Sequence, residues 1–168
     1  LPSECNVRAL AVYPSDPQRI LAGTDAGIFR SNDNGVTWEE LDSPMGDLQI
    51  WSVTVDPMDA ETIFAGTKPE GFRSKDGGKN WEKLSMGVDM NCPVGTPRTT
   101  NIIVDPRDNR TIWAGIEVDG IYKSLDGGDS WVHLPDLVPD PFHGEIHGMA
   151  ILPGATTPIY ATTRCVIA

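Results

Sequence analysis

The chain contains one eight-residue phrase three times: Ser31-Asn-Asp33-Asn-Gly35-Val-Thr-Trp38, Ser74-Lys-Asp76-Gly-Gly78-Lys-Asn-Trp81 and Ser124-Leu-Asp126-Gly-Gly128-Asp-Ser-Trp131. Serine, aspartate, glycine and tryptophan stand at the same four places in each copy. Self-similarity at a spacing of about 40–50 residues is typical of repeat architectures, in which every repeat is one supersecondary unit. The phrase therefore predicts the fold before any single residue predicts a function.

A second alignment, made on proline, extends the repeat to four copies. An isoleucine follows the proline by six residues every time, at Pro14 and Ile20, Pro57 and Ile63, Pro106 and Ile112, and Pro153 and Ile159. A constant spacing in four places indicates one structural unit written four times. We expect a single domain over residues 1–168.

Each copy contains four short segments with the composition of β-strands. In the second copy they span residues 51–56, 63–67, 71–73 and 81–84. The first segment is largely apolar, which suits a strand buried on both faces, and the proline after it ends the pairing because it has no N–H to donate. Asn-Gly or Gly-Gly before the fourth segment predicts a hairpin, since glycine accepts a positive φ. We expect four-stranded antiparallel sheets.

The repeated phrase lies in the turn between the third and fourth strands, where its shared residues have mechanical roles. The carboxylates of Asp33, Asp76 and Asp126 can accept N–H groups of their own turns, as in an Asx turn. The serine hydroxyl adds a bond to this network, and the tryptophan buries its ring against the neighbouring sheet. We expect a structural turn; catalysis or calcium binding by the aspartates is the alternative.

This phrase resembles the Asp box of the bacterial neuraminidase repeat (BNR) β-propellers, which include sialidases, xyloglucanases, sortilin-type receptors and photosystem-assembly factors. The pattern S-x-D-x-G-x-x-W matches at all three sites, and the repeat around it is similar to that of bacterial BNR propellers of unassigned function. The resemblance implies an all-β fold, a β-propeller of four-stranded antiparallel blades. It also implies that the boxes lie opposite the ligand site. Because enzymes and receptors share the box, it implies no particular function.

The alignment places the blades at residues 6–43, 48–86, 98–136 and 145–168, the last with three strands. The chain thus holds three complete blades and part of a fourth, whereas members of the family usually have six or more. An open arc of blades exposes strand edges and sheet faces that invite pairing with another chain. We expect that two copies complete one ring; the alternative is a fragment of a longer gene product.

Composition argues against two classes of partner. The net charge of the 168 residues is −11. Binding of nucleic acid requires a basic surface, and an anionic membrane repels an acidic protein, so neither partner is expected. No apolar run approaches the ~20 residues of a membrane span. The chain shows no signal peptide and begins at Leu1, so a cytoplasmic and a secreted location both stay open.

No cofactor and no metal site are expected. Cys5, Cys92 and Cys165 have no metal-ligand spacing, and their odd number fits ordinary thiols better than a disulfide framework, with one bridge as the alternative. His143 and His147 would share one face of a helix and could hold a metal there. They lie instead in a loop that enters a strand, without a third ligand close in sequence.

Propeller geometry brings two kinds of connection to the mouth of the central channel. These run from the fourth strand of one blade to the first of the next, and from the second strand to the third. We call this surface the channel face, and the opposite surface, which carries the repeated phrases, the box face. Equivalent positions there differ in chemistry, which the repeat itself does not require, so they are candidates for ligand binding. They include Arg8, Trp51, Arg98, Thr100 and His147. Trp51 could stack on a sugar or a peptide side chain, or pack between blades.

Two functions stay open. The sialidase resemblance implies a clasp of three arginines, but the Arg-Ile-Pro phrase that carries the first of them is missing. Xyloglucanases use two carboxylates across a cleft, and Glu117, Asp119 and Glu145 are the candidates for such a pair, with nothing that marks them out. We therefore favour a non-catalytic binding or scaffold module for a protein, peptide or glycan. A glycoside hydrolase, or a fragment of one, is the alternative.

Overall fold

The structure, a computed structural model, describes residues 1, 4–90, 95–134, 146–152 and 159–163. The first sheet contains β1 (Val7–Tyr13), β2 (Asp16–Thr24), β3 (Gly27–Ser31) and β4 (Glu39–Glu40). The second contains β5 (Ser52–Val55), β6 (Ile63–Gly66), β7 (Gly71–Ser74) and β8 (Glu82–Lys83). The third contains β9 (Arg98–Asp105), β10 (Asp108–Glu117), β11 (Gly120–Ser124) and β12 (Val132–His133). In this part of the chain no helix is long and apolar enough to cross a bilayer.

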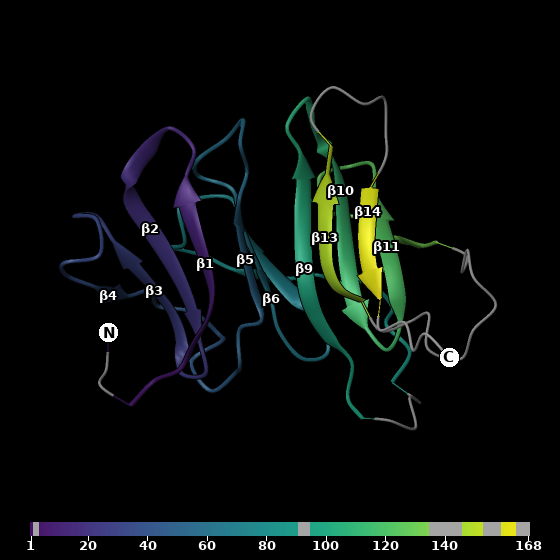
Figure 1. Cartoon of the computed structure of the whole chain (residues 1–168), viewed down its shortest axis with the longest axis horizontal. Coiled ribbons are helices and arrows are strands. Elements are labelled where there is room, and N and C mark those ends of the chain that lie inside the picture. Colours follow the sequence, from purple (N-terminus) through teal and green to yellow (C-terminus); the bar gives the residue numbers. More distant parts are fainter. Residues whose placement is uncertain (2–3, 91–94, 135–145, 153–158, 164–168) are drawn as a thin grey trace.

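All strand pairs are antiparallel, and each sheet keeps its strands in chain order. The first strands of successive sheets, β1, β5, β9 and β13 (Ile146–Ile151), contact one another in turn across the molecule (Figure 1). β14 (Ile159–Thr163) pairs with β13. This is the arrangement of propeller blades, and it confirms the all-β fold class. The third strand expected for the last blade falls in residues 164–168, outside the described residues.

The apolar cores lie between neighbouring sheets. One core joins the first two sheets through Leu21, Ile28, Val53 and Ile63, all of them buried. The next core begins at Phe64, whose side chain points to the opposite face of β6 and meets the third sheet. Alternate residues of one strand therefore belong to different cores, as expected for a strand buried on both faces.

The first strand of the first sheet departs from that expectation. Leu10 and Val12 of β1 are 64% and 54% exposed, while Tyr13 on the other face is fully buried. The corresponding positions of β5 are Val53 and Val55, which are buried against the first sheet. The prediction of a strand buried on both faces is wrong for β1, because no described sheet covers its second face.

The glycine of each Ala-Gly pair marks a close approach between sheets. A Cβ on Gly66 would overlap the side chain of Ser52 and the backbone carbonyl oxygen of Thr99 in the next sheet. A Cβ on Gly23 would lie 2.6 Å from Ile50 Cγ2. Because glycine has no Cβ, the next first strand can pack directly on the second strand. The repeat thus requires glycine here for packing.

The turn that carries the repeated phrase is held by hydrogen bonds within itself. In the second sheet, Ser74 Oγ donates to Asp76 Oδ1 at 2.9 Å and accepts the Gly78 N–H at 2.8 Å. Trp81 Nε1 donates to the Gly78 carbonyl at 3.1 Å, and Gly78 has a φ of 89°. The same bonds occur at the other two phrases. After the turn, the fourth strand pairs with the third over two residues in each sheet.

The residue before the tryptophan, which the sequence analysis did not single out, completes each turn. These residues are Thr37, Asn80 and Ser130, and each gives its N–H and a side-chain donor to the aspartate. Hydrogen bonds from this side chain are the largest cause of the low aspartate pKa values: the pKa falls to about 2 for Asp33 and Asp76, and it is also lowered for Asp126. The aspartates act as ionised acceptors inside the turn.

An arginine on the third strand reaches from one sheet into the turn of the next. Arg30 Nη1 donates to the Gly77 carbonyl at 3.1 Å. Arg73, whose side chain is only 4% exposed, donates to the Gly127 carbonyl and to Asp129. These bonds lie on the box face and connect neighbouring sheets at their outer ends.

Candidate functional site

Trp51 lies between two arginines on the channel face. The guanidinium carbons of Arg8 and Arg98 each lie 4.4 Å from the centroid of its ring. Arg8 comes from β1, Arg98 opens β9, and Trp51 directly precedes β5, so three sheets meet here. The contact follows from the repeat, because neighbouring first strands begin side by side. Cation–π contacts of this kind contribute about 0.5–2 kcal/mol each. We call these three residues the Arg–Trp cluster.

The cluster is held in place by its neighbours. The Trp51 N–H donates to the Gly66 carbonyl at 2.7 Å. Arg98 forms an ion pair with Glu117, its register partner at the end of β10. The indole Nε1 of Trp51 is buried and has no hydrogen-bond partner among the described residues. Two guanidinium groups thus lie over the half-buried ring and compete with a sugar for stacking on Trp51.

Asp25 adds a carboxylate beside Arg8. Its side chain accepts the Asn6 N–H at 2.8 Å and the Asn6 amide at 2.6 Å. These bonds, with a smaller contribution from the charge of Arg8, lower the pKa of Asp25. Each arginine of the Arg–Trp cluster thus has a carboxylate nearby, Asp25 for Arg8 and Glu117 for Arg98.

Two further candidates from the sequence do not join the cluster. The Thr100 hydroxyl donates to the Ile146 carbonyl at 2.6 Å, which ties the third sheet to β13. His147 is exposed on β13 itself. The side chain of Thr100 is thus used for contact between sheets.

The described carboxylate candidates for catalysis are each held by internal partners. Glu117 pairs with Arg98. Asp119 accepts the Tyr122 hydroxyl at 2.6 Å and the Asp89 N–H at 3.0 Å. Burial and this neighbouring carboxylate raise the pKa of Tyr122. Glu145, like Cys92, Cys165 and His143, lies outside the described residues.

One further residue of the channel face, Glu70 in the turn between β6 and β7, contacts a neighbouring connection. Glu70 accepts the Gly87 N–H at 3.2 Å and pairs with Lys83 at 3.0 Å. Within the described ranges, no group of three or more His, Cys, Asp or Glu side chains is placed to hold a metal.

A comparison with protein families matches residues 26–144 to Sortilin-Vps10, described as sortilin, neurotensin receptor 3. The chain belongs to the Sortilin-Vps10 family. The match covers well over half of the chain and confirms the resemblance to sortilin-like BNR propellers. No curated protein matches this Sortilin-Vps10 chain.

Solved structures similar to the Sortilin-Vps10 chain are propeller proteins with different activities. An ancestral GH74 enzyme has a TM-score of 0.75 and 23% identity over 94% of this chain and 22% of its own. YCF48 bound to D1 peptide has a TM-score of 0.65 and 22% identity over 91% and 47%. The extracellular domain of the one component system BT4673 from B. thetaiotaomicron has a TM-score of 0.71 and 14% identity over 97% and 21%. At these identities the likeness concerns the fold alone.

The Sortilin-Vps10 chain spans less than half the length of each of these three structures. An enzyme, a protein bound to a peptide and the extracellular domain of a one component system share its fold. The family and the fold therefore do not identify the ligand, which has to be inferred from the chemistry of the site.

Proposed function

We propose that this chain is a non-catalytic binding module whose ligand surface is the channel face, at the Arg–Trp cluster. The observation that carries the proposal is the stack of Arg8, Trp51 and Arg98, because it unites three sheets in one polar site. Residues with different chemistry at equivalent repeat positions are not needed for the repeat itself. Their assembly at one point is best explained by recognition of a ligand.

The chemistry of the cluster favours an acidic peptide over a glycan. Guanidinium groups bind carboxylates in a two-pronged geometry, and Arg8 is exposed. Arg98 is 31% exposed and would exchange Glu117 for a ligand carboxylate. The ring of Trp51, on which a sugar could stack, already has two guanidinium groups over it. The peptide bound to YCF48 supports a peptide ligand on this fold, at the level of analogy only.

A glycoside hydrolase is the second candidate, favoured by the GH74 neighbour. It needs two carboxylates directed at one glycosidic bond. Glu117 and Asp119 are instead bonded to Arg98 and Tyr122, so neither is directed at a substrate. Hydrolysis would have to be carried by residues outside this pair.

A direct test uses a hexaglutamate peptide, its hexaglutamine counterpart and a xyloglucan heptasaccharide in isothermal titration calorimetry. The glutamate peptide should bind, and both Arg8→Gln and the glutamine peptide should weaken binding at least about tenfold, because the charged pair is lost. Arg19→Gln is the matched control. Arg19 also stacks on an aromatic ring, at 4.0 Å from Tyr13, but at the other end of β1.

Equal binding of the glutamate peptide to Arg8→Gln and wild type would refute the role of the cluster. Cleavage of xyloglucan that Glu117→Gln abolishes would replace the binding proposal with the hydrolase. Cleavage that survives Glu117→Gln and Asp119→Asn would show that a hydrolase acts through other residues.

We further propose that the exposed face of β1 packs against the fourth sheet of a second copy. Leu10 and Val12 correspond to Val53 and Val55 of the second sheet, which are buried against the first sheet. At the other end, Leu152 is 50% exposed. Thr162 stands where the other sheets have the close-approach glycine, so this contact would be less close than the internal ones.

Light scattering at high micromolar concentration tests this association. The wild type should show the mass of two copies, and Leu10→Lys should shift it to one, because a buried unpaired charge is costly at an apolar contact. Val36→Lys, at an 80% exposed residue of the first box turn, is the control and should leave the mass unchanged. A wild-type mass of a single copy would contradict the proposal.

A further inference from the structure

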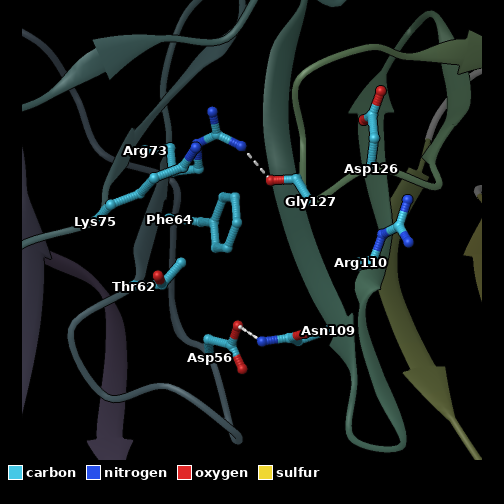
Figure 2. Close-up of a pocket in the computed structure, with 9 residues that line it drawn as sticks. All are labelled: Asp56, Thr62, Phe64, Arg73, Lys75, Asn109, Arg110, Asp126 and Gly127. Carbon is cyan, nitrogen blue, oxygen red and sulfur yellow. Dashed lines mark hydrogen bonds between the residues drawn. The ribbon is translucent and has the colours of Figure 1, made fainter.

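A hollow of about 120 Å³ lies between the second and third sheets on the box face. Figure 2 shows Arg73 and Phe64 on the wall from the second sheet, and Gly127 and Asn109 on the wall from the third. Two hydrogen bonds span it: Arg73 donates to the Gly127 carbonyl, and Asn109 Nδ2 donates to Asp56 at 2.9 Å. The hollow is on the opposite face from the Arg–Trp cluster.

Between the first and second sheets, the corresponding place is filled by a tyrosine ring. Tyr13 holds the repeat position of Asp56, since each directly precedes the proline. It is fully buried, and burial raises the pKa of its hydroxyl, while the nearby charges of Arg19 and Arg30 partly oppose this rise. Arg30 in turn holds the repeat position of Arg73, which lines the hollow. The first interface thus shows that an aromatic ring beside an arginine can occupy the position of the hollow.

The second sheet has the smaller Asp56 at the repeat position of Tyr13, so part of the volume that the tyrosine ring fills in the first interface is empty in the second. The Asp56 carboxylate turns to its own loop, where it accepts the Met58 N–H at 2.7 Å, and it is 3% exposed. Phe64, which holds the repeat position of Leu21, is larger than leucine and fills some of this volume. The hollow that remains approaches the size of an apolar cavity of about 150 Å³ that holds benzene.

The lining of the hollow contains more cations than carboxylates, and two further carboxylates, Glu82 and Asp129, lie close to Arg73 and Lys75. Its charged lining residues are three cations and two carboxylates, namely Arg73, Lys75, Arg110, Asp56 and Asp126. Lys75 takes the repeat position of Asn32 and so adds a charge that the first interface lacks. Its side chain is 58% exposed and lies 3.6 Å or more from its acidic neighbours. The ammonium can therefore turn to a ligand at small cost.

We propose that this hollow binds a small aromatic carboxylate. The ring takes the place that the Tyr13 ring fills in the first interface, beside Phe64 and Arg73. The carboxylate meets the ammonium of Lys75 at the open side, where Lys acts as a point charge. A free aromatic acid and the end of a peptide that finishes in phenylalanine share this chemistry.

The test titrates the whole chain with benzoate, benzyl alcohol and acetate, followed by amide shifts in NMR. Benzoate should shift the amide signals of Gly127 and Asn109. Benzyl alcohol, which has the ring without the charge, and acetate, which has the charge without the ring, should each bind at least about tenfold more weakly. Asp56→Tyr should abolish benzoate binding because it fills the hollow as Tyr13 does. Lys75→Gln should weaken it about tenfold, whereas Lys79→Gln, an exposed lysine of the same turn, should not.

The proposal fails if benzoate does not bind at millimolar concentration, if acetate binds as well as benzoate, or if Lys75→Gln binds like wild type. Lys75 is exposed, so this variant stays informative even if Asp56→Tyr does not fold. A glycine peptide ending in phenylalanine, compared with its C-terminal amide, identifies the source. Tighter binding of the free-acid peptide than of benzoate indicates a chain end, and the reverse order indicates a free acid.

Discussion

Replacing Gly66 with alanine is expected to force the second and third sheets apart and to cost about 3 kcal/mol of unfolding free energy or more. The new Cβ would overlap the Thr99 carbonyl oxygen, which accepts the Ser52 hydroxyl at 3.1 Å. This oxygen cannot move alone, because the Thr99 N–H is bound to the Thr67 carbonyl at 2.9 Å. The strain must therefore spread into the packing of two sheets.

Gly46→Ala is the matched control for this substitution. Gly46 has no atom within 4 Å of its would-be Cβ, and its φ is not in the left-handed region. Alanine there should change stability by less than about 1 kcal/mol. Urea unfolding followed by tryptophan fluorescence measures both variants. Equal losses in the two would show that close approach at Gly66 does not limit the packing.

Replacing Arg73 with methionine should be the second largest effect, at about 3 kcal/mol. The methionine keeps most of the apolar volume but loses every donor. Arg73 is 4% exposed and binds Glu82 at 2.7 Å, Asp129 at 2.5 Å and the Gly127 carbonyl. The loss also removes the donor of the half-buried Gly127 carbonyl. The expected loss of unfolding free energy is at the low end of the range for buried ion pairs. Both carboxylates are more than half exposed, so they remain solvated when Arg73 is replaced.

Lys75→Met separates this effect from simple loss of charge. Lys75 lies near the same two carboxylates, at 3.8 Å from Glu82 and 3.6 Å from Asp129, but it is 58% exposed. Exposed pairs of this kind contribute at most about 1 kcal/mol. The midpoint of urea unfolding for each variant gives the comparison. If Lys75→Met were as destabilising as Arg73→Met, the contact between sheets would not be the source of the stability.

The turns show how far sequence reasoning reaches. Ser74, Asp76, Gly78 and Trp81 bind one another within eight residues. Residue type and spacing predict the bonds of the serine and the aspartate, but the bond from the Trp81 indole to the Gly78 carbonyl was not predicted. The missed partner, Asn80, lies inside the same phrase. This position is threonine, asparagine and serine in the three copies. All three side chains have a hydrogen-bond donor, but the residue type is not repeated, so the alignment did not mark the position.

The channel face shows where that reasoning ends. The repeat alignment brings Arg8, Trp51 and Arg98 to one region, since Arg8 and Trp51 hold the same repeat position and Arg98 precedes that position by two residues on the next first strand. It cannot tell that both guanidinium groups cover the indole, because that depends on how far each sheet is displaced against the next. Thr100 shows the same limit, since its hydroxyl turns to the Ile146 carbonyl of the following sheet.

By itself, then, the sequence determined the repeat, the antiparallel sheets and the chemistry of the turns, because these depend on bonds between residues close in the chain. Only the tertiary structure decided what lies between the sheets. The exposed face of Leu10, the contact of Thr100 with Ile146 and the hollow beside Asp56 depend on how residues of different repeats lie against one another. Such contacts depend on the stacking of whole sheets, which no single repeat specifies.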